Sequence, residues 1–154
     1  MVRIKEYKVG CSDSWNKIDA CAELLRKSYP PFQEYLNKPL TIEGIATLAE
    51  RTIVRTCLSF SQSSLQRYAN LHYICIAEEK DPFQRDTALL HELAHAWFGP
   101  SLDDRSKDIY SQRNSIIAEW FGRTWRAQAE LLRATITTFH FQPYIYDLAS
   151  YDAF

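Results

Sequence analysis

Two histidines and a glutamate lie within five consecutive residues, His91-Glu92-Leu93-Ala94-His95. On an α-helix, residues at i and i+4 lie on one face about one turn apart, so both imidazoles can reach the same metal ion. A glutamate directly after the first histidine lies beside such an ion without binding it, where it can take a proton from water. The spacing therefore predicts one Zn²⁺ bound by His91 and His95, with Glu92 as the general base of a hydrolysis.

The competing interpretation is a core in which both histidines are hydrogen-bonded and Glu92 is ion-paired, without a metal. The helix that would carry the motif is apolar nearly all round. Burying three polar groups in such a helix is costly unless they have strong partners. We therefore favour the metal. The apolar positions of this helix are Leu89, Leu90, Leu93, Ala94, Ala96, Trp97 and Phe98.

A catalytic zinc site needs a third protein ligand and an open position for water. Glu119 is the first candidate, because it is a charged residue inside the apolar run 116–121, and such a residue needs a partner. The alternative is that Glu119 pairs with Arg123 at i+4, or with Arg126. His140 is the second candidate ligand. Three acidic residues precede Glu119 in a polar stretch and are more typical of a solvated loop: Asp103, Asp104 and Asp108.

The elements around the motif follow from periodicity and stop signals. We expect helices over about 13–27, from Thr41, over about 84–98 and over about 112–135, the third closed by Gly99-Pro100. Strand composition marks 2–9, 52–58 and 72–77, with loops over 31–39, 61–64 and 101–110. With no linker or repeat, we predict a single domain over 1–154 with a C-terminal tail at 139–154.

Composition limits the classes of function. The chain has 154 residues, 46% of them hydrophobic, and a net charge of −1, which favours a packed domain and gives no sign of a nucleic-acid partner. No run approaches the length of a membrane span, and residues 1–15 lack a signal-type apolar run, so we expect a cytoplasmic protein. The four cysteines have wide spacings, which argues against a structural zinc site, and the missing signal-type run predicts reduced, mostly buried thiols: Cys11, Cys21, Cys57 and Cys75.

The motif and its surroundings resemble the gluzincin metallopeptidases. Residues 91–99 are similar to the H-E-L-A-H-x-W-F-G run of the large gluzincin aminopeptidases, and Ala118-Glu119-Trp120-Phe121-Gly122 is similar in outline to their third-ligand helix. In size the chain looks more like the minigluzincins and the ImmA-type small metallopeptidases, with a similar strand-turn-helix entry at 74–86. The ImmA pattern has an acidic residue where this chain has Ile117, and the spacing from His95 to Glu119 is longer than in the aminopeptidases.

The resemblance implies an α+β, zincin-like fold, with a small mixed sheet packed against the motif helix and a following long ligand helix. It also implies peptide-bond hydrolysis, in which zinc polarises the carbonyl and Glu92 moves the proton. Gluzincins commonly place an acid four residues after the ligand glutamate to orient the first histidine. Arg123 stands there, so the residue that orients His91 is unassigned. Five residues are candidates to stabilise the oxyanion or bind substrate: Tyr110, Arg113, His140, Tyr144 and Tyr146.

Two further hypotheses concern activity. The alternative to an enzyme is a regulatory or interaction module that keeps the zinc but cleaves nothing. The tail at 139–154 combines aromatic residues with Asp147 and Asp152, so it could hold the enzyme latent by lying in its cleft; the alternative is a tail packed on the surface. We expect a peptide or protein substrate and no nucleic acid or membrane, and the sequence leaves the oligomeric state open.

Overall fold

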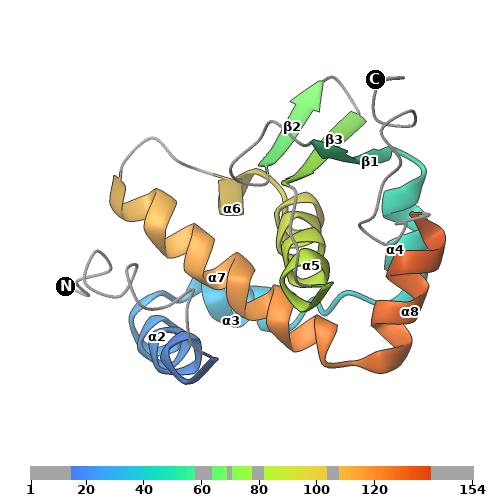
Figure 1. Ribbon diagram of the computed structural model, residues 1–154. Coiled ribbons are helices and arrows are strands. Elements are labelled where there is room, and N and C mark those ends of the chain that lie inside the picture. Colours follow the sequence, from blue (N-terminus) through green and yellow to red (C-terminus); the bar gives the residue numbers. More distant parts are fainter. Residues whose placement is uncertain (1–14, 58–63, 69–70, 78–81, 104–107, 140–154) are drawn as a thin grey trace.

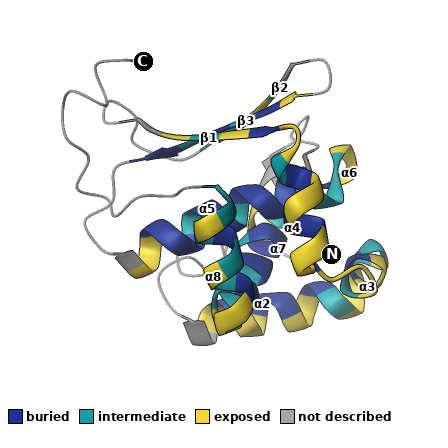
Figure 2. Cartoon of the chain, turned by 90° about the vertical axis from the view of Figure 1, so that its right-hand side faces the viewer, coloured by how far each residue is buried: buried dark blue, intermediate teal, exposed yellow. Residues whose placement is uncertain are grey.

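The computed structural model describes residues 15–57, 64–68, 71–77, 82–103 and 108–139 (Figure 1). Helices dominate these residues, and a small sheet forms a separate layer beside them (Figure 2). The helices are α2 (Trp15–Ser28), α3 (Pro31–Leu36), α4 (Ile42–Ala49), α5 (Pro82–Phe98), α6 (Pro100–Asp103), α7 (Asp108–Arg126) and α8 (Ala129–Thr138). The strands are β1 (Thr52–Cys57), β2 (Ser64–Tyr68) and β3 (Leu71–Ala77).

The sheet is mixed and has the strand order β1-β3-β2. β1 runs parallel to β3, with Thr52 opposite His72, while β2 runs antiparallel to β3. Residues on alternate positions of a strand face the same side of a sheet. In β3 the buried set is His72, Ile74 and Ile76, so this face lies on the helices. The predicted α+β class, with a small mixed sheet against the motif helix, is confirmed.

Helix α5 carries the histidines and occupies the centre of the fold. It packs against β3 on one side and against α7 on the other. Leu89, Leu90, Leu93 and Ala94 are at most 1% exposed, which agrees with the apolar character of this helix in the sequence. Gly99 ends it with a φ of 85°, a left-handed conformation that glycine adopts without strain. The motif therefore lies on a rigid, buried element.

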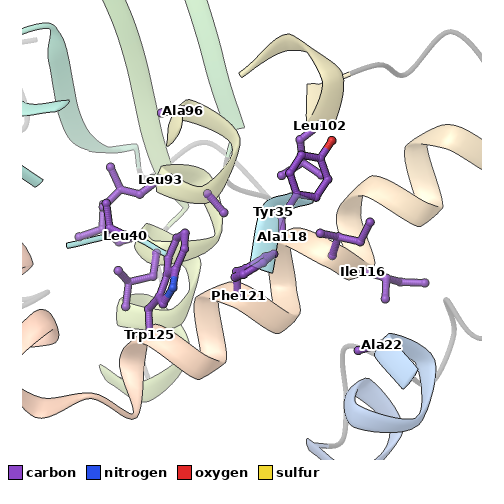
Figure 3. Close-up of a cluster of buried hydrophobic side chains, with 14 of the residues drawn as sticks. Ala22, Tyr35, Leu40, Leu93, Ala96, Leu102, Ile116, Ala118, Phe121 and Trp125 are labelled. Carbon is purple, nitrogen blue, oxygen red and sulfur yellow. The ribbon is translucent and has the colours of Figure 1, made fainter. Parts of the chain in front are cut away.

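An aromatic cluster fixes the long helix α7 against the end of α5. Phe121 contacts Phe98 with a ring-centroid distance of 4.7 Å, and it contacts Trp125 at 5.2 Å. Figure 3 shows Phe121 and Trp125 on α7 in the same buried cluster as Leu93 on α5. Burial of an aromatic side chain contributes several kcal/mol, about 25 cal/mol per Å² of apolar area. This packing keeps α5 and α7 in a fixed relation.

Several element predictions were wrong in detail. The predicted single helix over 112–135 is two helices, because the backbone at Gln128 is extended, with φ −91° and ψ 103°. After this break α8 packs on α4, which a continuous helix could not reach (Figure 1). The predicted loops over 31–39 and 101–110 contain α3 and α6, and β2 was not predicted. The predicted strand at 2–9 lies outside the described residues.

The cysteine prediction is also wrong where the structure tests it. Cys21 on α2 and Cys75 on β3 are disulfide-bonded. The prediction of reduced thiols depended on the missing signal-type run and not on the positions of the cysteines in the fold. Disulfides persist mainly in oxidising compartments. Cysteine usage therefore no longer supports the expected cytoplasmic location.

Candidate metal centre

The two motif histidines face each other across one turn of α5. Their ring centroids are 5.2 Å apart and the ring planes are inclined by 52°. His95 is almost fully buried, at 1% exposure, whereas 15% of the His91 side chain is exposed. The predicted arrangement of two imidazoles on one helix face is thus present in the structure.

Glu119 of α7 reaches across to His91. The distance from His91 Nδ1 to Glu119 Oε1 is 2.9 Å. A carboxylate can only accept hydrogen bonds, so this bond requires a proton on Nδ1. In the neutral imidazole the lone pair is then on Nε2, the nitrogen through which a histidine can bind a metal. Glu119 therefore holds His91 in the tautomer with the proton on Nδ1.

The second oxygen of Glu119 is bound by Arg123. The Arg123 Nε donates to Glu119 Oε2 at 2.8 Å, and the two side chains are 10% and 19% exposed. Burial alone would raise the pKa of the Glu119 carboxyl. The hydrogen bond and charge of His91, followed by those of Arg123, outweigh burial and hold the pKa below its ordinary value. Glu119 is therefore a carboxylate at neutral pH.

Glu92 lies on the other side of His91. Its Oε2 is 4.0 Å from His91 Nε2, and the residue is only 4% exposed. Its Oε1 is buried and makes no hydrogen bond within the described parts of the chain. A buried carboxylate oxygen without a partner is costly, and a cation or a polarised water beside it would remove that cost. Glu92 thus lies buried beside His91, and its role as the general base stays a prediction.

Two residues that the sequence analysis did not assign to the site help to build it. Arg67 of β2 donates through Nη2 to the backbone oxygen of His95 at 2.8 Å, which ties the sheet to α5. Gly122 lies against His91, and a Cβ there would come within 2.9 Å of the His91 backbone nitrogen. A glycine in the interior of an apolar helix is a sequence signal for such close approach. Nothing local in the sequence marks Arg67.

Comparison with known families agrees with this site. The sequence profile of the M78 peptidases, described as the IrrE N-terminal-like domain, matches residues 45–151, more than half of the chain. The chain belongs to this family. The M78 peptidases are zincin-like metallopeptidases, so the resemblance to ImmA-type minigluzincins and the zincin-like fold class are confirmed. Searches of curated proteins and of solved structures found no significant match.

The residues of this M78 domain fit a metal in part. Two imidazoles are in place, one with its tautomer fixed, and a buried carboxylate oxygen needs a partner. Within the described ranges, however, no three His, Cys, Asp or Glu side chains are grouped closely enough to hold an ion. Oε1 of Glu119 is held on His91 Nδ1 and Oε2 on Arg123. The predicted role of Glu119 as a ligand stays a prediction.

The candidates for oxyanion or substrate contacts divide into two groups. Arg113 stacks on Tyr29 at 3.9 Å and on Tyr110 at 4.7 Å, and it donates to Asn114. These contacts tie Tyr110 and Arg113 to each other and to the end of α2, and none of them is with a residue of the metal centre. The remaining candidates, His140, Tyr144 and Tyr146, lie outside the described residues, as does the tail from residue 140 on. Their predicted roles, and tail-mediated latency, are not tested.

Among the described residues, no helix combines the length and apolar character that a membrane crossing requires.

Proposed function

We propose that this M78 domain is a zinc-dependent peptidase in which His91 and His95 hold one zinc ion and Glu92 is the general base. The observation that carries the proposal is the pair of imidazoles 5.2 Å apart on α5, with the unsatisfied oxygen of Glu92 buried beside them. Bound zinc would supply a Lewis acid that polarises a scissile carbonyl and makes a water molecule more acidic.

The protein's own residues provide the proton transfer. Glu92 takes a proton from the attacking water and later delivers it to the nitrogen of the leaving amine. Its burial on α5 keeps the carboxylate at a fixed place and limits competition from bulk water. His95 lies deeper than His91, so a peptide substrate would approach from the side of the more exposed imidazole.

Zinc content and peptide cleavage test this proposal together. Wild type, Glu92→Gln and His95→Ala would be purified, analysed for metal by mass spectrometry, and incubated with a mixed peptide library. We expect about one zinc per chain in wild type and Glu92→Gln and little in His95→Ala, and a loss of cleavage of about 10²–10⁴-fold in Glu92→Gln. Glu130→Gln, at an exposed carboxylate on α8, is the matched control and should behave as wild type.

Two results would contradict the proposal. A folded wild type that takes up no zinc would exclude the metal site, and equal cleavage by wild type and Glu92→Gln would exclude the general base. Zinc in both proteins without cleavage by either would favour the alternative, a zinc-binding interaction module. That alternative is supported by the absence, among the described residues, of a group of three His, Cys, Asp or Glu side chains that could hold an ion.

Latency through the tail is a separate part of the proposal. A chain truncated after Phe139, the last described residue, would keep α8 and the core contact of Phe139. If the tail lies in the cleft, the truncated protein cleaves the library faster than the full chain. An equal rate from a folded truncation would contradict latency and leave the zinc site untouched.

A further inference from the structure

The contacts of Glu119 carry an inference that rests on the proposed zinc site. We infer that Glu119 is a positioning residue, which acts on the metal through His91 instead of binding it as the third ligand. Its Oε1 holds the proton-bearing Nδ1 of His91, and its Oε2 is held by Arg123. The chain Arg123–Glu119–His91 thus fixes one metal-binding nitrogen in place.

Geometry determines which nitrogen of His91 can meet the ion. The 2.9 Å bond to Glu119 uses Nδ1, and Nε2 lies on the opposite side of the ring, 4.0 Å from Glu92 Oε2. Metal-binding histidines almost always donate their other ring N–H to a carboxylate or carbonyl, which fixes the ring and raises its basicity. Glu119 stands in that position relative to His91, on the side of the ring away from Nε2.

The ion pair between Glu119 and Arg123 keeps Glu119 from turning toward the ion as a ligand. Both side chains are largely buried, and the Glu119 carboxylate balances the positive charge of the Arg123 guanidinium. Breaking a buried ion pair is strongly destabilising, because it leaves a charge without its partner in a poorly solvated place. If Glu119 turned toward an ion at His91 Nε2, it would give up at least one of two short, charge-assisted hydrogen bonds.

The backbone packing holds this arrangement. Gly122, one turn after Glu119, brings α7 to within contact of the backbone of His91 and Thr87. Helices in such close contact cannot slide or separate without disturbing the core. Glu119 is therefore presented to His91 from a backbone that is itself fixed.

Nuclear magnetic resonance of the histidine rings tests the inference without an activity assay. In metal-free and zinc-loaded wild type, we expect a low-field, slowly exchanging proton on His91 Nδ1, with zinc bound at Nε2. In the isosteric Glu119→Gln this resonance should leave the low-field range in both states, because the charged acceptor is gone. Glu130→Gln, at an exposed carboxylate on α8, should leave it unchanged.

Zinc affinity, measured by competition with a chelator, gives the second readout. Loss of an outer carboxylate on a histidine ligand typically lowers metal affinity about 10–100-fold, and we expect this for Glu119→Gln. The inference is overturned if zinc loading removes the low-field His91 resonance, or if that resonance in the zinc-loaded protein is insensitive to Glu119→Gln. A wild type that binds no zinc would contradict the proposed function and this inference with it, whereas a zinc-loaded wild type whose His91 resonance fails these tests overturns the inference alone.

Discussion

His72 and His91 both make contacts through their ring nitrogens, but the groups that these nitrogens face differ. Arg67, which can only donate, lies 2.6 Å from His72 Nε2, and His72 Nδ1 faces Thr52 Oγ1 at 3.4 Å. Both nitrogens of His72 are therefore used within the sheet. His91 uses Nδ1 for Glu119 and directs Nε2 toward Glu92. His72 is therefore held as part of the sheet by its neighbours on β1 and β2.

The first prediction concerns Arg67 at the residue scale. Arg67→Met keeps much of the apolar stem but removes the donors to His72 and to the His95 backbone oxygen. A hydrogen bond contributes about 0.5–1.5 kcal/mol net, and Arg67 is only half-buried, so we expect the loss of both bonds to lower the free energy of unfolding by about 1–3 kcal/mol. That corresponds to a Tm lower by roughly 2–10 °C for a domain of this size.

Differential scanning calorimetry would measure this change. Arg133→Met, at an exposed arginine on α8, is the control and should melt with wild type. A melting temperature of Arg67→Met equal to that of the control would show that the link between β2 and α5 does not stabilise the fold.

At the scale of elements, the close approach of α7 to α5 yields the second prediction. A methyl group at Gly122 would come within 2.9 Å of the His91 backbone nitrogen and 3.1 Å of the Thr87 oxygen. Alanine in place of glycine usually stabilises a helix by about 1 kcal/mol. Here we expect Gly122→Ala to destabilise the protein by about 1–3 kcal/mol, because the methyl group forces the helices apart.

Urea denaturation would measure the effect, with Ser115→Ala at an exposed position of the same helix as the control. Zinc affinity of Gly122→Ala should fall as well, since the shift of α7 moves Glu119 away from His91. A Gly122→Ala protein that is more stable than wild type would mean that the two backbones are not in contact.

Elements with strong local signals could be predicted, and those decided by packing could not. Helix α5 combines an apolar run with a Gly99-Pro100 stop, and Thr41 caps α4 by accepting from the Gly44 nitrogen at 3.0 Å. β2 has a single aliphatic residue, Leu65, and forms only by pairing with β3. No Gly or Pro marks the break before α8, which follows from docking on α4.

The same distinction holds within the site. The spacing of His91, Glu92 and His95 within about one helix turn was enough to predict how they lie on α5. The contact of Glu119 with His91 joins residues on two helices, 28 positions apart, and depends on how these helices pack. Sequence analysis could therefore indicate that Glu119 needs a partner, for which it offered a metal, Arg123 or Arg126, but it could not indicate the contact with His91.

For the whole molecule, the third prediction concerns the cysteines. Cys21 and Cys75 are disulfide-bonded, so neither should react with a thiol reagent in unfolded, unreduced protein. Denaturation is needed because Cys21 is buried and would be protected even as a thiol. Peptide mass spectrometry after alkylation should find both residues modified only when a reductant is added first. Alkylation of either residue without reductant would show that the disulfides do not form.

The central claim, that His91 and His95 bind zinc in this M78 domain, is tested most directly by anomalous diffraction at the zinc absorption edge. The crystals would be grown with zinc from the Glu92→Gln protein, which keeps both imidazoles. Because this protein lacks the general base, it would not cleave a bound peptide. We predict one anomalous peak at about 2.0–2.1 Å from Nε2 of each histidine, the usual Zn–N distance. No peak between the two rings in a zinc-saturated crystal, or a peak elsewhere only, would contradict the account.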